Sequence, residues 1–177
     1  MKASELQHGD VLVYSWRKNA SFMARVIRLI TGNKVTHCSV VVEYESNKFI
    51  LEQMGERMHS FLPLYYAMDG EKISCMRPKF IVPPASYEIF YRKPYGYLCT
   101  LDAMVNHFLG LFSNKPYKPR LVNWFKSTNV DCSILVGTVL KLNENAEWCK
   151  CVEVIEPDDY IAHPEHFEDL GEIEWGQ

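Results

Sequence analysis

Two apolar segments joined by a short polar turn constrain the fold of this chain most. Residues 35–44 are rich in β-branched side chains, and residues 48–54 follow directly after Glu45, Ser46 and Asn47. β-Branched residues favour strands, and a polar turn between two such segments is typical of a β-hairpin. The sequence therefore predicts an antiparallel hairpin over this region.

The register of this hairpin decides which polar side chains share a face of the sheet. If the chain turns at residues 45–46, counting outward places Ser39 opposite Glu52 and His37 opposite Met54. Opposite residues share a face and strand side chains alternate, so His37 and Glu52 become diagonal neighbours, about 7–8 Å apart at the backbone. A slip of one residue would put them on opposite faces. The prediction is therefore specific to one register.

Beyond the hairpin, the sequence predicts further strands and helices. The expected strands are at 11–14, 72–76, 80–82 and 87–91, and the expected helices are at 21–30, at 98–112 and from Cys132 onward. Gly9-Asp10 is a turn signal before the first strand, and Ser21 is a suitable cap for the first helix. No internal repeat or low-complexity linker interrupts the chain, so residues 1–177 are expected to form a single α+β domain.

A cysteine stands where the last of these helices begins. Asp131-Cys132-Ser133 precedes the mostly apolar segment 134–140. A thiol at a helix start lies among unpaired backbone N–H groups and at the positive end of the helix dipole, which favours its thiolate form. Cys132 is therefore a candidate nucleophile, with His37 as a base and Glu52 as the group that orients the imidazole. The alternative is a buried structural cysteine.

Composition narrows the class of protein. The formal net charge is −3 and Lys and Arg are scattered along the chain, which disfavours binding to nucleic acid or to an anionic membrane. The N-terminus lacks the apolar core of a secretory signal and no apolar run is long enough to cross a bilayer, so a cytoplasmic location is expected. The 6 cysteines are irregularly spaced and are expected to be reduced thiols.

Two other classes of function stay open at this point. Cys149, Cys151, His163 and His166 contain the donor types of a zinc site, although Cys-x-Cys is a tighter spacing than zinc ligands usually have. The chain could also be a binding module that keeps the fold of an enzyme without turnover. The intact set of His37, Glu52 and Cys132 speaks against this second alternative.

In this combination the residues resemble the circularly permuted branch of the NlpC-type, papain-like cysteine hydrolases, especially the YiiX-like proteins and their poxvirus and lecithin-retinol-acyltransferase-like relatives. The similarity runs along nearly the whole chain in short pieces. These pieces are Gly9-Asp10-Val11-Leu12, Thr36-His37-Cys38-Ser39-Val40-Val41-Val42, Glu52, Pro94-Tyr95-Gly96-Tyr97, Asp131-Cys132-Ser133-Ile134-Leu135-Val136, Glu156-Pro157-Asp158-Asp159-Tyr160 and His163-Pro164. The order of histidine, acid and cysteine is that of the permuted enzymes.

This resemblance implies a papain-like α+β fold, in which the helix that carries the cysteine packs on a small antiparallel sheet or partial barrel. It makes Cys132 the nucleophile, His37 the base and Glu52 the orienting residue, and it suggests Tyr14 as an additional donor to substrate. No metal and no cofactor are implied. The chain departs from the pattern at Ile134, where relatives often have Glu, and at Cys38, where a small or aliphatic residue is usual.

The substrate that the resemblance implies is the amide bond of a cell-wall peptide, which would make the chain a peptidase or amidase acting on peptidoglycan. A lipid ester or a thioester is the alternative acyl substrate. This interpretation is compatible with a phage or a bacterial origin. The sequence does not predict the oligomeric state. Fold similarity alone does not determine a substrate.

Overall fold

A computed structural model describes residues 1–15, 25, 29, 32, 34–54, 57–63, 72–84, 132–149 and 155–175. The strands in these residues are β1 (Val11–Ser15), β2 (Val35–Tyr44), β3 (Asn47–Met54), β4 (Arg57–Pro63), β5 (Ile73–Pro78) and β6 (Phe167–Glu172). The helices are η1 (Ala3–Glu5), α4 (Cys132–Val139), α5 (Leu142–Asn145) and α6 (Asp159–Ala162). This content agrees with the predicted α+β class.

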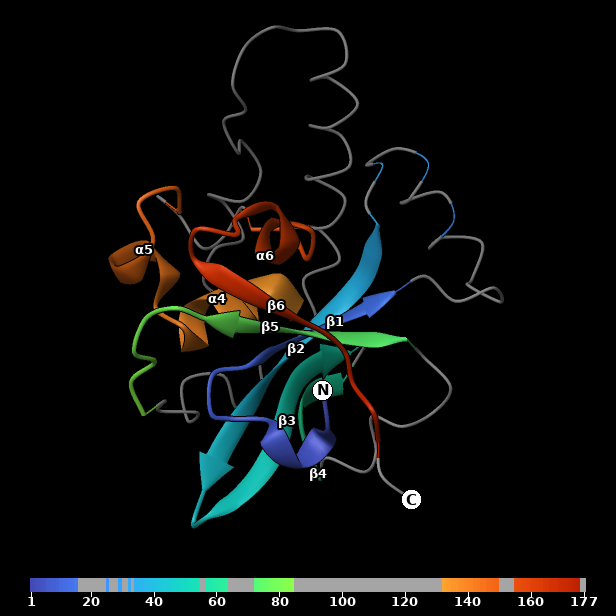
Figure 1. Cartoon of the computed structure of the whole chain (residues 1–177), viewed down its shortest axis with the longest axis vertical. Coiled ribbons are helices and arrows are strands. Elements are labelled where there is room, and N and C mark those ends of the chain that lie inside the picture. Colours follow the sequence, from blue (N-terminus) through green and yellow to red (C-terminus); the bar gives the residue numbers. More distant parts are fainter. Residues whose placement is uncertain are drawn as a thin grey trace, which may run out of the picture.

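The strands form one antiparallel sheet of 6 strands in the order β4-β3-β2-β1-β5-β6. Figure 1 shows β1 and β2 at the centre of this sheet, with α4, α5 and α6 to the left of and above the sheet centre. The N-terminal strand β1 thus pairs with β2, the next strand in the sequence, and with β5, which comes much later. Residues from the beginning, middle and end of the chain are combined in a single sheet.

The hairpin of β2 and β3 has the predicted register. Tyr44 pairs with Asn47, and the ladder continues to the pair Val40 and Leu51. Glu45 and Ser46 make the turn with φ angles of 48° and 64°. Two turn residues with positive φ are typical of the type I′ hairpin, whose twist matches that of its strands. The tight turn therefore fixes the pairing on which the proximity of His37 and Glu52 depends.

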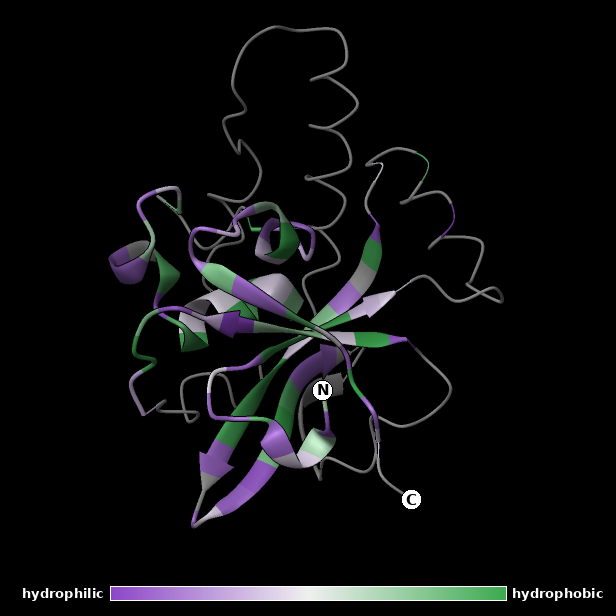
Figure 2. Cartoon of the chain, viewed as in Figure 1, coloured by the Kyte–Doolittle hydropathy of each residue, from purple (hydrophilic) through white to green (hydrophobic). Residues whose placement is uncertain are grey.

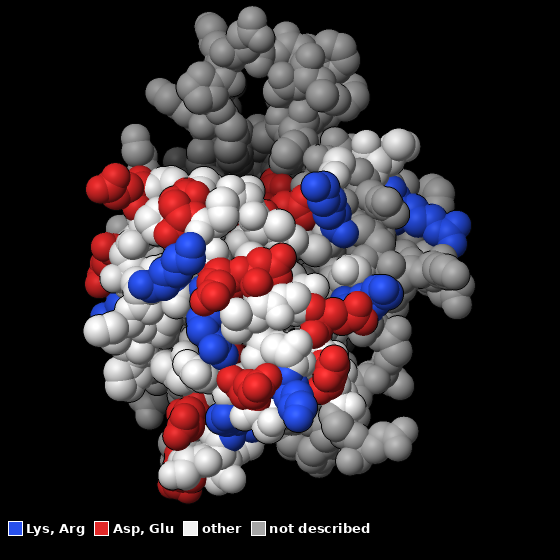
Figure 3. Space-filling view, viewed as in Figure 1, with Lys and Arg blue, Asp and Glu red and all other residues white. Residues whose placement is uncertain are grey.

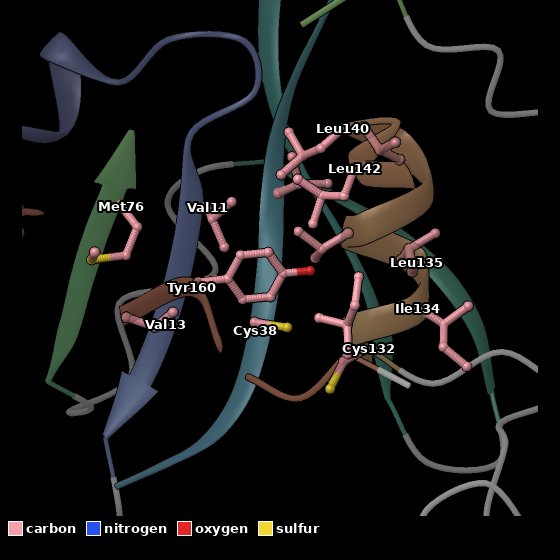
Figure 4. Close-up of a cluster of buried hydrophobic side chains, with 14 of the residues drawn as sticks. Val11, Val13, Cys38, Met76, Cys132, Ile134, Leu135, Leu140, Leu142 and Tyr160 are labelled. Carbon is pink, nitrogen blue, oxygen red and sulfur yellow. The ribbon is translucent and has the colours of Figure 1, made fainter. Parts of the chain in front are cut away.

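Helix α4 covers one face of the sheet, where it packs against β2 and β3. Figure 4 shows the apolar side chains of this interface, with α4 on one side and β1 and β2 on the other. The sheet contributes Val11, Val13, Cys38, Val40 and Val42, which are alternate residues of their strands. A mostly buried helix on an apolar sheet face is the arrangement expected for the segment after Cys132.

The opposite face of the sheet carries a second apolar cluster. Its buried members are Leu6, Leu12, Tyr14, Val41, Ile50, Ile73, Cys75 and Ile173. Figure 2 shows apolar residues concentrated along the central strands. The central strands are therefore buried on both faces, which explains the nearly continuous apolar run in residues 40–42.

A glycine is required where the chain enters β1. Gly9 has a φ of +91°, and a Cβ at this position would lie 2.6 Å from a side-chain carbon of Val82. Both the backbone conformation and the close approach of Val82 exclude a side chain here. The predicted turn at Gly9-Asp10 is confirmed. The predicted strand at 80–82 is wrong, because β5 ends at Pro78 and these residues form an irregular segment.

The remaining predicted strands and helices agree with the structure only in part. The predicted strand at 72–76 corresponds to β5, whereas β4 and β6 were not predicted at all. The predicted strand at 87–91 and helix at 98–112 lie outside the described residues. The same holds for the helix at 21–30 except at Arg25 and Leu29, which are both helical.

The described surface carries charges of both signs. On the face in Figure 3, Lys and Arg are interspersed with Asp and Glu. Within the described part of the chain, no helix has the length and apolar character to span a membrane.

Candidate active site

His37 and Glu52 contact each other as the hairpin register predicts. The Nε2 atom of His37 lies 3.2 Å from Oε2 of Glu52, at the end of the hairpin away from its turn. The two side chains are only 15% and 7% exposed, so little water competes with this interaction. A carboxylate at one ring nitrogen fixes the orientation of an imidazole and leaves its other nitrogen, Nδ1, for proton exchange.

Tyr14 extends this polar cluster onto β1. Tyr14 pairs with His37 across the two strands, and their ring centroids are 5.0 Å apart. The Tyr14 hydroxyl lies 2.9 Å from Oγ of Ser39, which is fully buried. Ser39 was not among the predicted site residues, although the register had already placed it opposite Glu52. The structure thus gathers these four polar side chains on one sheet face.

Cys132 is the first residue of α4, as predicted, and is 5% exposed. Its sulfur contacts neighbouring residues of β2, with hydrogen bonds to the Cys38 thiol, to the Cys38 backbone and to the His37 side chain. Figure 4 shows Cys132 at the end of α4 that lies close to β2, with Cys38 on the strand facing it. The three residues predicted to form the site, Cys132, His37 and Glu52, are therefore brought together.

The backbone of β2 explains how one sulfur reaches both His37 and Cys38. Val41 exchanges hydrogen bonds with Gly9 and Asp10 on the β1 side, so the N–H of Cys38, an odd number of residues away, points to the β3 side. The ladder with β3 ends at Val40, before this N–H. The Cys132 sulfur accepts the hydrogen bond from the Cys38 N–H and therefore lies near the plane of the sheet. His37 and Cys38 are adjacent in β2 and point to opposite faces, so the sulfur lies between their two side chains.

These contacts shift the pKa values of both reacting groups. Hydrogen bonding from Cys38 and the charge and hydrogen bond of His37 outweigh burial and hold the pKa of the Cys132 thiol well below its usual range. Burial alone would lower the pKa of His37, but the thiolate of Cys132 and the carboxylate of Glu52 raise it to about 10. The favoured state at neutral pH is a thiolate beside an imidazolium.

Burial raises the pKa of Tyr14, with smaller contributions from the negative charges of Glu52 and Cys132. Its hydroxyl therefore keeps its proton and can act only as a neutral hydrogen-bond donor or acceptor. The role of Tyr14 toward a substrate stays a prediction.

Two residues of the C-terminal segment position these elements and were not singled out from the sequence. The buried hydroxyl of Tyr160 donates to the carbonyl oxygen of Ser133, in the first turn of α4, at 3.0 Å. The carboxylate of Asp158 accepts hydrogen bonds from the backbone N–H groups of Lys34 and Val35, where β2 begins. Both residues lie in the segment 156–160 that contributed to the family resemblance, which was the available signal.

The alternative zinc site is not assembled in the described residues. Cys151 lies outside them, His163 stacks on Trp148 at 4.0 Å between ring centroids, and its Nδ1 lies 2.7 Å from Glu165. Among the described residues, no group of three or more His, Cys, Asp or Glu side chains is placed to hold a metal ion.

Comparison with known proteins shows a likeness in structure but none in sequence. No family model matches the sequence, and no curated protein matches it. Among solved structures, the chain is similar to a protein described as metalloprotein YiiX from Escherichia coli O157:H7, with a TM-score of 0.52 and 16% sequence identity. The likeness covers 96% of this chain and 98% of that chain. This chain has a YiiX-like fold.

Proposed function

We propose that this protein is a cysteine hydrolase of the circularly permuted, NlpC-type papain-like class, and that it transfers an acyl group through Cys132, His37 and Glu52. One observation carries the proposal. Cys132, at the start of a buried helix, contacts an imidazole whose Nε2 lies 3.2 Å from a buried carboxylate. This is the arrangement of nucleophile, base and orienting group that covalent acyl transfer requires.

The first half of the reaction forms a thioester. The Cys132 thiolate attacks the carbonyl carbon of an amide, ester or thioester, and the carbonyl oxygen becomes an oxyanion. The imidazolium of His37 then gives its Nδ1 proton to the leaving group as the bond between that group and the carbonyl carbon breaks. Glu52 holds the ring in position throughout.

The second half returns the enzyme to its starting state. Neutral His37 removes a proton from a water molecule, and the resulting hydroxide attacks the thioester carbonyl. The bond between the acyl carbon and the Cys132 sulfur breaks, which releases a carboxylic acid and regenerates the thiolate. The proton taken from water remains on His37, so the ion pair is restored.

The oxyanion needs hydrogen-bond donors while it exists. The backbone N–H of Cys132 lies in the first turn of α4, where such groups have no partner within the helix. Tyr14 is the proposed second donor, because its hydroxyl stays protonated and its ring lies beside His37. Donors of this kind stabilise the tetrahedral intermediate more than the ground state.

The mechanism contains no metal-dependent step. The structural neighbour is described as a metalloprotein, but among the described residues of this chain no group of three or more His, Cys, Asp or Glu side chains is placed to hold a metal ion. The described residues therefore do not fit a metal centre, whereas they do supply a nucleophile and its base.

The proposed substrate is the amide bond of a cell-wall peptide. This choice rests on the family resemblance of the sequence and not on contacts with a ligand. The class of reaction is the same for lipid esters and thioesters, so the test must cover all three acyl groups.

The test is to trap the acyl-enzyme and to identify what is turned over. The purified chain is incubated with a panel of muropeptides, fatty-acyl esters and acyl thioesters, and product release is measured beside intact-mass and peptide-mapping analysis. We expect cleavage between the amino acids of a muropeptide and an acyl adduct on Cys132. Release of fatty acid alone would reassign the substrate class. An absence of turnover and of any adduct on Cys132 would overturn the proposal.

A further inference from the structure

The contact between two thiols at the site favours the Cys132 thiolate, and it also places a second sulfur beside the proposed nucleophile. Cys38 and Cys132 are both free, and both lie in the apolar cluster between the sheet and α4. The Cys38 thiol hydrogen bonds to the Cys132 sulfur. In Figure 4 the Cys38 side chain points from β2 toward α4, where Cys132 stands at the helix start. Only the Cys132 sulfur is the nucleophile in the proposed hydrolysis.

The described part of the chain contains two other cysteines, Cys75 and Cys149. Cys75 lies in the cluster on the opposite face of the sheet, where burial and the nearby charge of Asp10 raise its pKa. Cys149 is buried after α5 and belongs to the same apolar cluster as Cys38 and Cys132. Of these cysteines, Cys38 is the one that hydrogen bonds to the Cys132 sulfur. These two residues therefore serve as internal controls for any reaction of the Cys38 and Cys132 pair.

We propose that Cys38 and Cys132 form a reversible disulfide that switches off the nucleophile under oxidising conditions. The two residues are held next to each other by different elements, β2 and α4, which pack together in the reduced protein. Disulfide formation can then start from a contact between the two sulfurs that already exists. The proposal goes beyond the proposed hydrolysis, because it requires only that the two sulfurs react with each other.

The oxidant is a hydroperoxide, with hydrogen peroxide as the simplest member. The Cys132 thiolate attacks one peroxide oxygen, the O–O bond breaks, and Cys132 becomes a sulfenic acid while the hydroxide released takes a proton and leaves as water. The Cys38 sulfur then attacks the Cys132 sulfur, the S–O bond breaks, and the Cys38 proton leaves with the hydroxide as a second water. Two thiols are oxidised and one peroxide is reduced to two waters.

The position of Cys38 favours the disulfide over further oxidation of Cys132. A sulfenic acid without a neighbouring thiol is oxidised further to the sulfinic acid, which common reductants do not reverse. Cys38, already hydrogen bonded to the reacting sulfur, competes with that second oxidation. The disulfide would thus inactivate the site and at the same time protect the nucleophile from permanent damage.

The experiment uses the full chain, reduced and then treated with a limited amount of hydrogen peroxide. Peptide mapping under non-reducing conditions locates any disulfide, and iodoacetamide labelling measures free Cys132. We expect a crosslink between the peptides that contain Cys38 and Cys132, at least a tenfold loss of Cys132 labelling, and full recovery after dithiothreitol. This measurement needs no hydrolytic substrate, so its outcome is independent of the proposed function.

Two variants sharpen the test. Cys38→Ala should lose the crosslink and accumulate Cys132 sulfinic acid, whereas the matched Cys75→Ala variant should crosslink as the wild type does. Wild-type protein whose Cys132 proceeds to the sulfinic acid without a crosslink would overturn the proposal. A crosslink of Cys132 to another cysteine would also overturn it, and this result does not depend on the folding of either variant.

Discussion

Two buried polar clusters lie at opposite ends of β1, and they differ in what their protons can do. Asp10, directly before the strand and 1% exposed, accepts hydrogen bonds from Arg77 at 2.8 and 2.7 Å and from the N–H of Gln7 at 2.7 Å. Near the other end, Tyr14 lies beside His37, which contacts Glu52 and Cys132. Both clusters pair a buried carboxylate with a cation.

The identity of the cation separates a structural pair from a reactive one. An arginine guanidinium does not release its proton in proteins, and the hydrogen bond to Asp10 raises the pKa of Arg77 further. An imidazolium can release its proton, and the His37 ring lies beside the Cys132 sulfur, whose own pKa is lowered. The Asp10 cluster is therefore expected to support folding, and the His37 cluster to support chemistry.

The largest expected effect comes from removing the sulfur. Cys132→Ala should lower turnover by about 10⁴-fold or more, because the covalent step loses its nucleophile. Labelling by iodoacetamide at this position should disappear while circular dichroism stays unchanged. Turnover within a few-fold of the wild type would show that the chemistry occurs elsewhere.

Replacing the base should have the next largest effect. His37→Ala should lower kcat by about 10²–10⁴-fold, since it removes the proposed proton donor to the leaving group. In the wild type, kcat should fall as the pH rises through about 10, where His37 loses its proton. It should also fall at low pH, where the Cys132 thiolate is protonated. A single-limbed pH profile would contradict the assignment of His37 as the acid.

A change in the Asp10 cluster should lower stability and leave the reactivity of Cys132 unchanged. Asp10→Asn should lower the free energy of unfolding by about 3 kcal/mol, because it leaves a partly buried guanidinium without its charge partner. Chemical denaturation measures this loss. Under conditions where the variant is folded, its rate of Cys132 labelling should equal that of the wild type. A loss of labelling in the folded variant would mean that the two clusters are coupled.

The smallest effect is expected at Tyr14. Tyr14→Phe removes the hydroxyl that contacts Ser39 and keeps the ring that lies beside His37. If the hydroxyl donates to the oxyanion, kcat should fall by about 10²-fold with little change in KM. Ser39→Ala is the matched control, since it removes the same hydrogen bond and leaves the Tyr14 hydroxyl in place. Equal losses in both variants would assign Tyr14 a positioning role only.

The hairpin and its polar pair could be predicted because local features determine them. A two-residue turn fixes the pairing of β2 with β3, and the alternation of strand side chains then places His37 near Glu52. The helix start at Cys132 was likewise readable from the polar-to-apolar transition in the sequence. These features depend on few residues and on no distant contact.

The remaining features depend on long-range pairing that no local pattern fixes. β6 contains three acidic residues, one glycine and only two apolar residues, so its sequence does not predict a strand. It forms a strand because the edge of β5 supplies its hydrogen-bond partners. The position of Tyr14 opposite His37 requires the register of β1 with β2, which no tight turn sets. The contact of Cys38 with Cys132 requires both the end of the β2–β3 ladder and the packing of α4.

The rate of Cys132 alkylation as a function of pH tests the central claim most directly, because it measures the thiolate itself. Iodoacetamide labelling is followed from about pH 5 to about pH 11, with His37→Ala as the control. We expect the wild-type rate to have reached its plateau already at neutral pH, and the rate of the variant to rise toward the ordinary cysteine pKa of about 8.5. A wild-type profile that rises with the same pKa as the variant would contradict a thiolate held by His37.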